Sequence, residues 1–330
     1  MYDKMNSWGD RFRLSIWGES HGQQVGVSID GVPAGIALSE EDFTADLERR
    51  RAGAAGTTPR KESDTPHIVS GVYNGFTTGS PLTIEFLNEN TRSGDYRNLT
   101  IHPRPSHADW VAQQKWGGYN DPRGGGHFSG RITLGMVAAG VVAKKILGEE
   151  VRFSTDIIEI GGCRDKEQWD AIISSAQQSQ DSVGGVIECR VQGVKAGLGE
   201  PFFDSVESLA AHLLFSVPAV NGVEFGAGFE AARMRGSEHN DPIISADGTT
   251  ATNHAGGIVG GITNGNEIVA RIAVKPTASI AQPQQTFNLE SGKVEELVIK
   301  GRHDVCITLR AAVVVEAALA IALADLKLRA

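Results

Sequence analysis

The chain has 330 residues, of which 40% are hydrophobic and 22% charged, a composition that excludes a wholly disordered or collagen-like protein. Its formal net charge of −9 argues against nucleic acid as a partner, because a nucleic-acid binder must neutralise many phosphates. Forty glycines favour tight turns and close backbone approaches over long uninterrupted helices.

Apolar periodicity predicts the secondary structure in chain order. A strand at Arg11–Trp17 and a strand at Val25–Asp30 come first, and a helix over Ser39–Arg51 begins with a capping box between Ser39 and Asp42. The later elements are a strand at Leu82–Phe86, a helix at Leu134–Leu147, a strand at Val186–Val191, a helix at Ser205–Phe215, strands at Glu267–Val274 and Val298–Ile299, and a helix at Ala311–Leu328. Strands gather in runs with few helices between them, which favours antiparallel sheets packed on helices, an α+β fold, over a doubly wound parallel sheet.

The cysteines, the first residues and the most apolar stretch indicate the cellular compartment of the protein. Cys163, Cys189 and Cys306 lie far apart with no CxxC pair, so we expect neither disulfides nor a metal site, and a reducing cytoplasm is the simplest location. The first residues lack the apolar core of an export signal. The most apolar stretch, Ala311–Leu328, contains charged residues and is expected to be a buried helix, so no membrane association is predicted.

The two halves of the chain resemble each other. Val25–Arg50 and Val186–Leu213 both follow the pattern strand, Gly-Val-x-Ala-Gly, helix, and Gly71–Gly75 echoes Gly261–Gly265 around an Asn-Gly turn signal. We therefore infer a duplicated strand-turn-helix-hairpin unit within one pseudo-symmetric domain.

Basic residues are concentrated in one part of the chain. Between Arg49 and Arg131, eleven Lys and Arg residues stand against seven acidic residues, so this stretch carries +4 and the remainder −13. Most of the basic residues are arginines, whose planar fork grips carboxylates and phosphates at two points. A solvated basic face and a pocket for a small polyanion both remain open at this point.

Two turns carry candidate histidines. Trp17–Gly22 (WGESHG) follows a strand and places His21 on a turn, but hydrolase chemistry is not indicated, because a serine and a histidine that are neighbours on a turn point apart and do not form a nucleophile–base pair. Pro103–Asp109 (PRPSHAD) holds His107 in a proline-stiffened segment. That rigidity suits a pre-positioned acid or base, although a loop histidine that caps a following helix is the alternative.

Glycine-rich and polar clusters complete the candidate set. Gly124–Arg131 (GGGHFSGR) leads into a helix, where free backbone N–H groups favour a phosphate, yet it is neither a P-loop nor a GxGxxG turn after a strand. Further clusters at Asn253–Gly257, Lys275–Ser279 and Gly301–Asp304 fall at breaks between periodic segments, where binding loops usually lie.

These clusters, taken in order, resemble the chorismate synthase family. The likeness covers nearly the whole chain and rests on WGESHG at Trp17–Gly22, IDGVPAG at Ile29–Gly35, the run Arg49–Arg51, PRPSHAD at Pro103–Asp109, AGLGEP at Ala196–Pro201, NHAGGIVGGITNG at Asn253–Gly265, KPTAS at Lys275–Ser279 and KGRHD at Lys300–Asp304. The resemblance implies one β-α-β sandwich domain over residues 1–330. It also implies conversion of 5-enolpyruvylshikimate 3-phosphate to chorismate by 1,4-anti-elimination of phosphate, with reduced FMN and no net redox change.

The resemblance also implies roles for individual residues. His21 would protonate the departing phosphate, His107 would keep the reduced flavin suitably protonated, and Asp304 would relay a proton near the flavin N5. Substrate binding would fall to Ser20, Arg50, Arg104 and Arg131. FMN binding would fall to Ser129, Ala219, Asn253, Gly260, Lys275, Pro276, Thr277, Ala278, Ser279 and Arg302.

The family likeness further implies a homotetramer. Because no added domain is obvious in the sequence, we also expect an external flavin reductase as the source of reduced FMN. The chain departs from the usual family pattern at His127–Phe128, at Ala52–Gly56 and at Pro218, and we assign no flavin contact to His127 or Phe128. An FMN-dependent oxidoreductase acting on a phosphorylated small acid, or a catalytically silent phosphometabolite-binding protein, are the competing interpretations.

Overall fold

The structure is a computed structural model that describes residues 6–53, 55–58, 62–90, 98–301 and 303–330. A first antiparallel sheet has the strand order β1-β2-β3-β7-β4, with bounds Ser7–Trp8, Arg13–Gly18, Gln24–Asp30, Leu82–Leu87 and His67–Ser70. A second antiparallel sheet has the order β10-β13-β9-β8, with bounds Val220–Phe225, Ile268–Val274, Gly185–Gln192 and Arg152–Ile160. Buried and less buried residues alternate along β7, as expected for a sheet with one face on the core.

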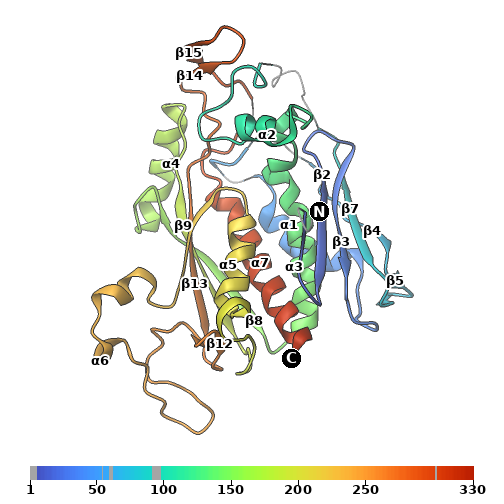
Figure 1. Ribbon diagram of the computed structural model, residues 1–330, viewed down its shortest axis with the longest axis vertical. Helices are drawn as coiled ribbons and strands as arrows, with labels where there is room; N and C mark the ends of the chain where they lie inside the picture. Colours follow the sequence, from blue (N-terminus) through green and yellow to red (C-terminus); the bar gives the residue numbers. More distant parts are fainter. Residues whose placement is uncertain (1–5, 54, 59–61, 91–97, 302) are drawn as a thin grey trace.

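Helices fill the space between the sheets. Figure 1 shows α3 (Thr133–Leu147), α5 (Val206–Ser216) and α7 (Thr308–Arg329) as a central layer, with α1 (Thr44–Arg50) beside them. Most of α3 and α7 is buried around the whole circumference, because each helix meets neighbours on several sides. Gly140 of α3 approaches Ala317 of α7 so closely that an added Cβ would lie 2.4 Å from the Ala317 Cβ. A continuous apolar core joins both sheets to this helical layer.

The β-α-β sandwich expected from the sequence is confirmed, and so are the four long helices. The segment expected to be helical from Ser39 begins as a 3₁₀ turn, η1 (Glu40–Phe43), and its capping is present, since the Ser39 N–H donates to the Asp42 carboxylate at 2.8 Å. Ala311–Leu328 lies within α7 and is almost entirely buried, as predicted. Among the described residues, no helix is long and apolar enough to cross a membrane.

One predicted strand is wrong. Val298–Ile299 is not part of a strand; the hairpin β14 (Gln284–Asn288)–β15 (Lys293–Leu297) ends just before it. The apolar side chain of Ile299 is instead buried in a small separate cluster with Leu99 and Leu297. The sequence prediction gave α2 (Asp109–Trp116) only as the helix that the alternative interpretation of His107 would require. It missed α4 (Trp169–Gln178), α6 (Gly236–His239) and the strands β1, β4, β8, β10, β14 and β15.

Four strands of the first sheet, in the order β2-β3-β7-β4, match the four strands of the second sheet, in the order β8-β9-β13-β10, whereas β1 has no counterpart in the second sheet. Thr77 Oγ1 donates to the Pro33 carbonyl and accepts from the Ile36 N–H. Thr263 Oγ1 makes the same pair of bonds with the Lys195 carbonyl and the Leu198 N–H. These matched contacts support the duplicated unit.

The sequence pairing of the two hairpins, however, was four residues out of register. Asn74-Gly75 does form the turn between β5 (Val72–Tyr73) and β6 (Phe76–Thr77). In the second half the turn between β11 (Ile258–Val259) and β12 (Ile262–Thr263) is Gly260-Gly261. Gly71–Gly79 therefore corresponds to Gly257–Gly265, because both Asn74 and Gly260 hold the positive φ that this turn requires.

Candidate active site

A cavity of about 430 Å³ lies at the end of the sandwich where α3 and α7 begin. Arg131 and Thr133 line it at the start of α3, and Ile307 and Arg310 line it at the start of α7. Because the N-terminal ends of helices carry partial positive charge, this position favours an anionic ligand. The cavity volume is that of a small-molecule site.

Most of the residues singled out in the sequence meet at this cavity. Its lining includes Ser20, His21, Arg50, Arg104, His107, Ser129, Arg131, Ala219, Lys275, Pro276, Thr277, Ala278, Ser279 and Asp304. Two others do not line it: Asn253 accepts from the Gly257 N–H and donates to the Glu267 carbonyl, and Gly260 forms the β11–β12 turn. Arg302 lies outside the described residues.

Consecutive glycines separate the two candidate histidines. A Cβ on Gly124 would lie 2.6 Å from His21 Nε2 and 2.8 Å from Ser20 Oγ, whereas a Cβ on Gly125 would lie 3.5 Å from His107 Nε2. Gly124 and Gly125 also have φ of +60° and +82°, in the region that favours glycine. The glycine turn is therefore shaped to admit both imidazoles into one cavity.

Two bonds hold this turn against the end of β2. The Ser20 N–H donates to the Gly126 carbonyl at 3.1 Å, and His127 Nδ1 lies 2.8 Å from the Gly18 carbonyl. The departure from the family pattern at His127 thus has a structural role in the turn that positions His21. Phe128 lines the cavity and packs against Trp116.

Arg50 and Arg131 are buried and share the carboxylate of Asp64. Asp64 Oδ1 lies 2.6 Å from Arg131 Nη1, and Asp64 Oδ2 lies 3.4 Å from Arg50 Nη1. The remaining Arg50 donors reach the Thr133 hydroxyl at 3.0 Å and the Gly130 carbonyl at 2.7 Å. Burial, and next the positive charge of Arg310, lower the pKa of Arg50 to about 9, so the site carries positive charge that an anionic ligand would relieve.

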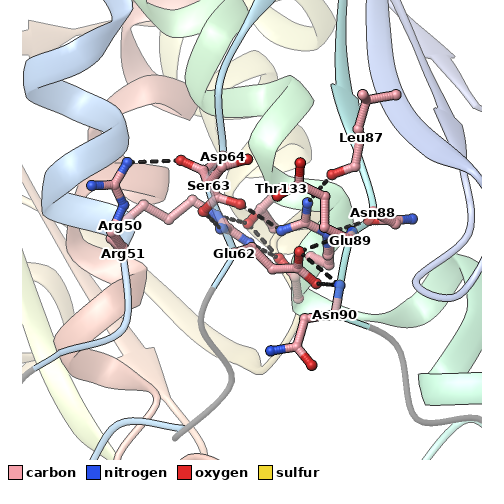
Figure 2. Close-up of polar contacts among 12 residues, drawn as sticks. Arg50, Arg51, Glu62, Ser63, Asp64, Leu87, Asn88, Glu89, Asn90 and Thr133 are labelled. Carbon is pink, nitrogen blue, oxygen red and sulfur yellow. Dashed lines mark hydrogen bonds and ion pairs between the residues drawn. The ribbon is translucent and has the colours of Figure 1, made fainter.

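The segment that carries Asp64 is tied down on both sides (Figure 2). Arg51 donates to the Ser63 carbonyl at 2.8 Å, and the Glu62 carboxylate accepts from the backbone N–H of Glu89 at 3.0 Å. Asp64 itself has φ of +50°, uncommon for a residue other than glycine, and it is held there by its arginine partners.

Arg104 forms a second charged cluster at the start of α2. Its Nε lies 2.7 Å from Asp109 Oδ2, its Nη2 lies 2.6 Å from Asp109 Oδ1, and its Nη1 donates to the Ser279 hydroxyl at 2.9 Å. His107 Nδ1 lies 2.7 Å from Asp109 Oδ1. Lys275 Nζ donates to the Ser106 carbonyl at 2.9 Å, which joins the Lys275–Ser279 segment to the histidine turn.

Asp304 and His303 enter the cavity just before α7. Asp304 pairs with Arg310 at 3.0 Å and accepts from the Thr58 N–H at 2.9 Å. His303 is largely buried, and burial, reinforced by the positive charge of Arg104, lowers its pKa to about 4, so the ring is neutral near pH 7. His303 Nε2 and Thr277 Oγ1 are buried without a hydrogen-bond partner among the described residues.

Sequence reasoning missed several of these groups. Asp109 stands in the PRPSHAD motif five residues after Arg104, and the need of a buried arginine for an acceptor could have pointed to it. Asp64 lies 67 residues from Arg131, so no local pattern links the two. Arg310 and His303 were likewise not singled out.

Comparisons with known proteins agree with one another. The family model described as chorismate synthase matches residues 12–328. A chorismate synthase of Chitinophaga pinensis is 61% identical over 324 residues, covering 98% of this chain and 97% of the relative, and one of Korarchaeum cryptofilum is 47% identical, covering 96% of each. A solved chorismate synthase structure superposes with a TM-score of 0.74 at 28% identity, covering 98% of this chain and 93% of that one.

Proposed function

The chain belongs to the chorismate synthase family, and we propose that the cavity between the starts of α3 and α7 is where it converts 5-enolpyruvylshikimate 3-phosphate to chorismate. The observation that carries this proposal is the meeting of His21 and His107 on either side of Gly124-Gly125, beside a cluster of buried arginines. The reaction is a carbon–oxygen lyase reaction that removes phosphate from C3 and a hydrogen from C6.

Arginine chemistry suits the substrate, which carries a phosphate and two carboxylates. Arg50, Arg104 and Arg131 line one cavity, and guanidinium groups bind such anions through paired, charge-assisted hydrogen bonds. Ser20 Oγ lies beside the His21 ring and adds a hydroxyl donor. In our assignment these side chains anchor the substrate, and His21 Nε2 gives its proton to the departing phosphate.

The family uses reduced flavin, and the cavity fits it. Thr277 Oγ1 and His303 Nε2 are buried polar atoms for which a bound ligand would supply the missing partner, and Lys275 adds positive charge. When bound, reduced FMN supplies electron density to the substrate as phosphate leaves, without net oxidation. Ser129, Ala219 and Lys275–Ser279 would hold it, with His107 Nε2 and Asp304 as the proton-carrying groups on this side.

Asn253 and Gly260 do not line this cavity, and we propose that a flavin contact from either residue would come from a second copy of the chain. The proposed homotetramer would supply such copies. Arg302 remains a proposed flavin ligand, and an external flavin reductase remains the proposed source of reduced FMN.

An anaerobic assay tests the function. We expect purified protein with dithionite-reduced FMN and 5-enolpyruvylshikimate 3-phosphate to form chorismate and phosphate while the reduced FMN concentration stays constant. Stoichiometric consumption of reductant would instead identify an oxidoreductase, and binding without product would identify a silent binding protein.

Arg131→Ala should weaken substrate binding about tenfold to a hundredfold and leave FMN binding unchanged, whereas Arg164→Ala, at an exposed arginine, should change neither.

A further inference from the structure

Asp109 lies behind the cavity wall and holds two of the side chains that form it. It is the first residue of α2 and its carboxylate is buried. Both oxygens are used by Arg104, through Nε at 2.7 Å, Nη2 at 2.6 Å and the backbone N–H at 3.1 Å. Oδ1 also meets His107 Nδ1 at 2.7 Å. One carboxylate thus joins a proposed substrate ligand to a proposed proton carrier.

The geometry determines which ring nitrogen of His107 carries hydrogen. Nδ1 lies 2.7 Å from Asp109 Oδ1 and 3.0 Å from Arg104 Nη2. If Nδ1 accepted a hydrogen bond from Arg104, its lone pair would face a carboxylate oxygen at 2.7 Å, which is repulsive because both atoms would be acceptors. Nδ1 therefore carries a hydrogen and donates to Asp109, while Arg104 Nη2 donates to the same oxygen.

The carboxylate keeps its charge throughout the neutral range. Burial opposes ionisation, but hydrogen bonds from Arg104 and His107 outweigh it and hold the pKa of Asp109 well below its usual range. The turn between the two partners is also constrained: Ser106 has φ of +57°, and its carbonyl accepts from Lys275 Nζ. Asp109 closes this turn from the side away from the cavity.

We propose that Asp109 is a positioning residue: it holds His107 in the form protonated on Nδ1, with Nε2 presented to the cavity beside Gly125, and fixes Arg104 in the same step. This inference rests on the proposed function for its catalytic consequence. A wrong ring form would turn an N–H toward the cavity in the neutral histidine and remove the lone pair that takes up a proton.

The ring form can be read without flavin or substrate. In long-range ¹H–¹⁵N spectra of deuterated, histidine-labelled protein, the His107 signals are those that disappear in His107→Ala. We expect the wild type to show protonated Nδ1, and Asp109→Asn to shift the ring toward the form protonated on Nε2 alone. Unprotonated Nδ1 in the wild-type protein would overturn the proposal even if Asp109→Asn does not fold.

A double-mutant cycle tests the consequence for catalysis. Asp109→Asn should lower kcat about tenfold to a hundredfold in the wild-type background but cause no further fall in a His107→Ala background. KM for the substrate should rise in both backgrounds, because Arg104 loses its partner in each. Multiplicative effects on kcat would show that Asp109 acts only on general structure. Asp165→Asn, at the exposed N-cap of the 3₁₀ turn η5 (Lys166–Gln168), which does not line the cavity, is the matched control and should change neither constant.

Failure of this inference is distinguishable from failure of the proposed function. A protein that forms no chorismate with reduced FMN contradicts the function, whatever the His107 spectrum shows. A protein that forms chorismate with His107 Nδ1 unprotonated contradicts only the role of Asp109.

Discussion

At the scale of single residues, the cavity places charged and polar groups where a ligand would complete their interactions. Asp64 is the shared partner of Arg50 and Arg131, and Asp109 is that of Arg104 and His107. These acids keep the arginines in place, since an unpaired buried charge costs several kcal/mol in a protein interior. His303 differs, because its buried Nε2 has no partner among the described residues and its ring is neutral.

Because of His303, we expect the free energy of unfolding to decrease in acid. The pKa of His303, about 4 in the folded protein, lies below the ordinary value of 6.5. Between these pH values the His303 ring is therefore protonated in the unfolded chain and neutral in the folded protein. The free energy of unfolding should therefore fall by up to about 3 kcal/mol as the pH is lowered through this window. His303→Gln should lose correspondingly less stability than the wild type, measured by urea unfolding at neutral pH and near pH 4. Equal losses in both proteins would contradict the assignment.

At the scale of elements, the glycine turn at residues 124–126 determines how close the two histidines come. It packs under the end of β2 on one side and beside the histidine turn on the other. Alternatives to glycine are excluded at Gly124 by contact with the His21 ring and at Gly126 by contact with the Asp121 carbonyl. The turn therefore couples the start of α3 to the end of β2.

Gly124→Ala tests this coupling, and Gly117→Ala is its matched control. The two glycines have nearly equal φ, +60° and +59°, so both substitutions carry a similar backbone strain of about 1 kcal/mol. The new methyl group at residue 124 would lie 2.6 Å from His21 Nε2, whereas at residue 117 its nearest neighbour would be Tyr119 Cδ2 at 3.9 Å. We expect kcat to fall about a hundredfold only in Gly124→Ala, because His21 must shift. Similar turnover in the two variants would show that the contact is relieved without cost.

At the scale of the whole molecule, α7 holds the segment that leads into β2 and also supplies one wall of the cavity. The Asp325 carboxylate is fully buried and accepts from the backbone N–H groups of Asp10, Arg11 and Phe12. Its second oxygen accepts from Arg329 at 2.8 Å. The entry into β2 is thus fixed by a residue more than 300 positions away in the chain.

We expect Asp325→Ala to lower the stability of the protein without changing substrate binding. Three backbone donors and one arginine would lose their acceptor, so we expect a loss of about 3–5 kcal/mol in the free energy of unfolding. KM for the substrate should stay unchanged at a temperature where the variant is folded. The reason is distance: Asp325 lies eleven residues beyond Val314, the last residue of α7 at the cavity, or about 16 Å along the helix. A raised KM in folded protein would show that the N-terminal segment affects the cavity directly.

Local patterns predicted the long elements because an element that buries one face alternates apolar and polar residues, as in β7, and a helix that is buried around its whole circumference has a continuous apolar run, as in α3. They failed at Val298–Ile299, where the apolar pair packs in a small cluster without a strand partner. They indicated α2 only within an alternative interpretation because its apolar residues follow no clear helical face: Trp110 and Val111 are exposed and Asp109 is buried.

The sequence alone determined the fold class, the arginine-rich stretch and, through ordered motifs, the family. These depend on residue type and spacing along the chain, and such information is local. Only the tertiary structure shows that Asp64 pairs with two arginines, that Asp109 pairs with an arginine and a histidine, and that the His303 ring is neutral. Those properties depend on burial and on distances between segments far apart in the chain, and both arise only when the sheets close around the helices.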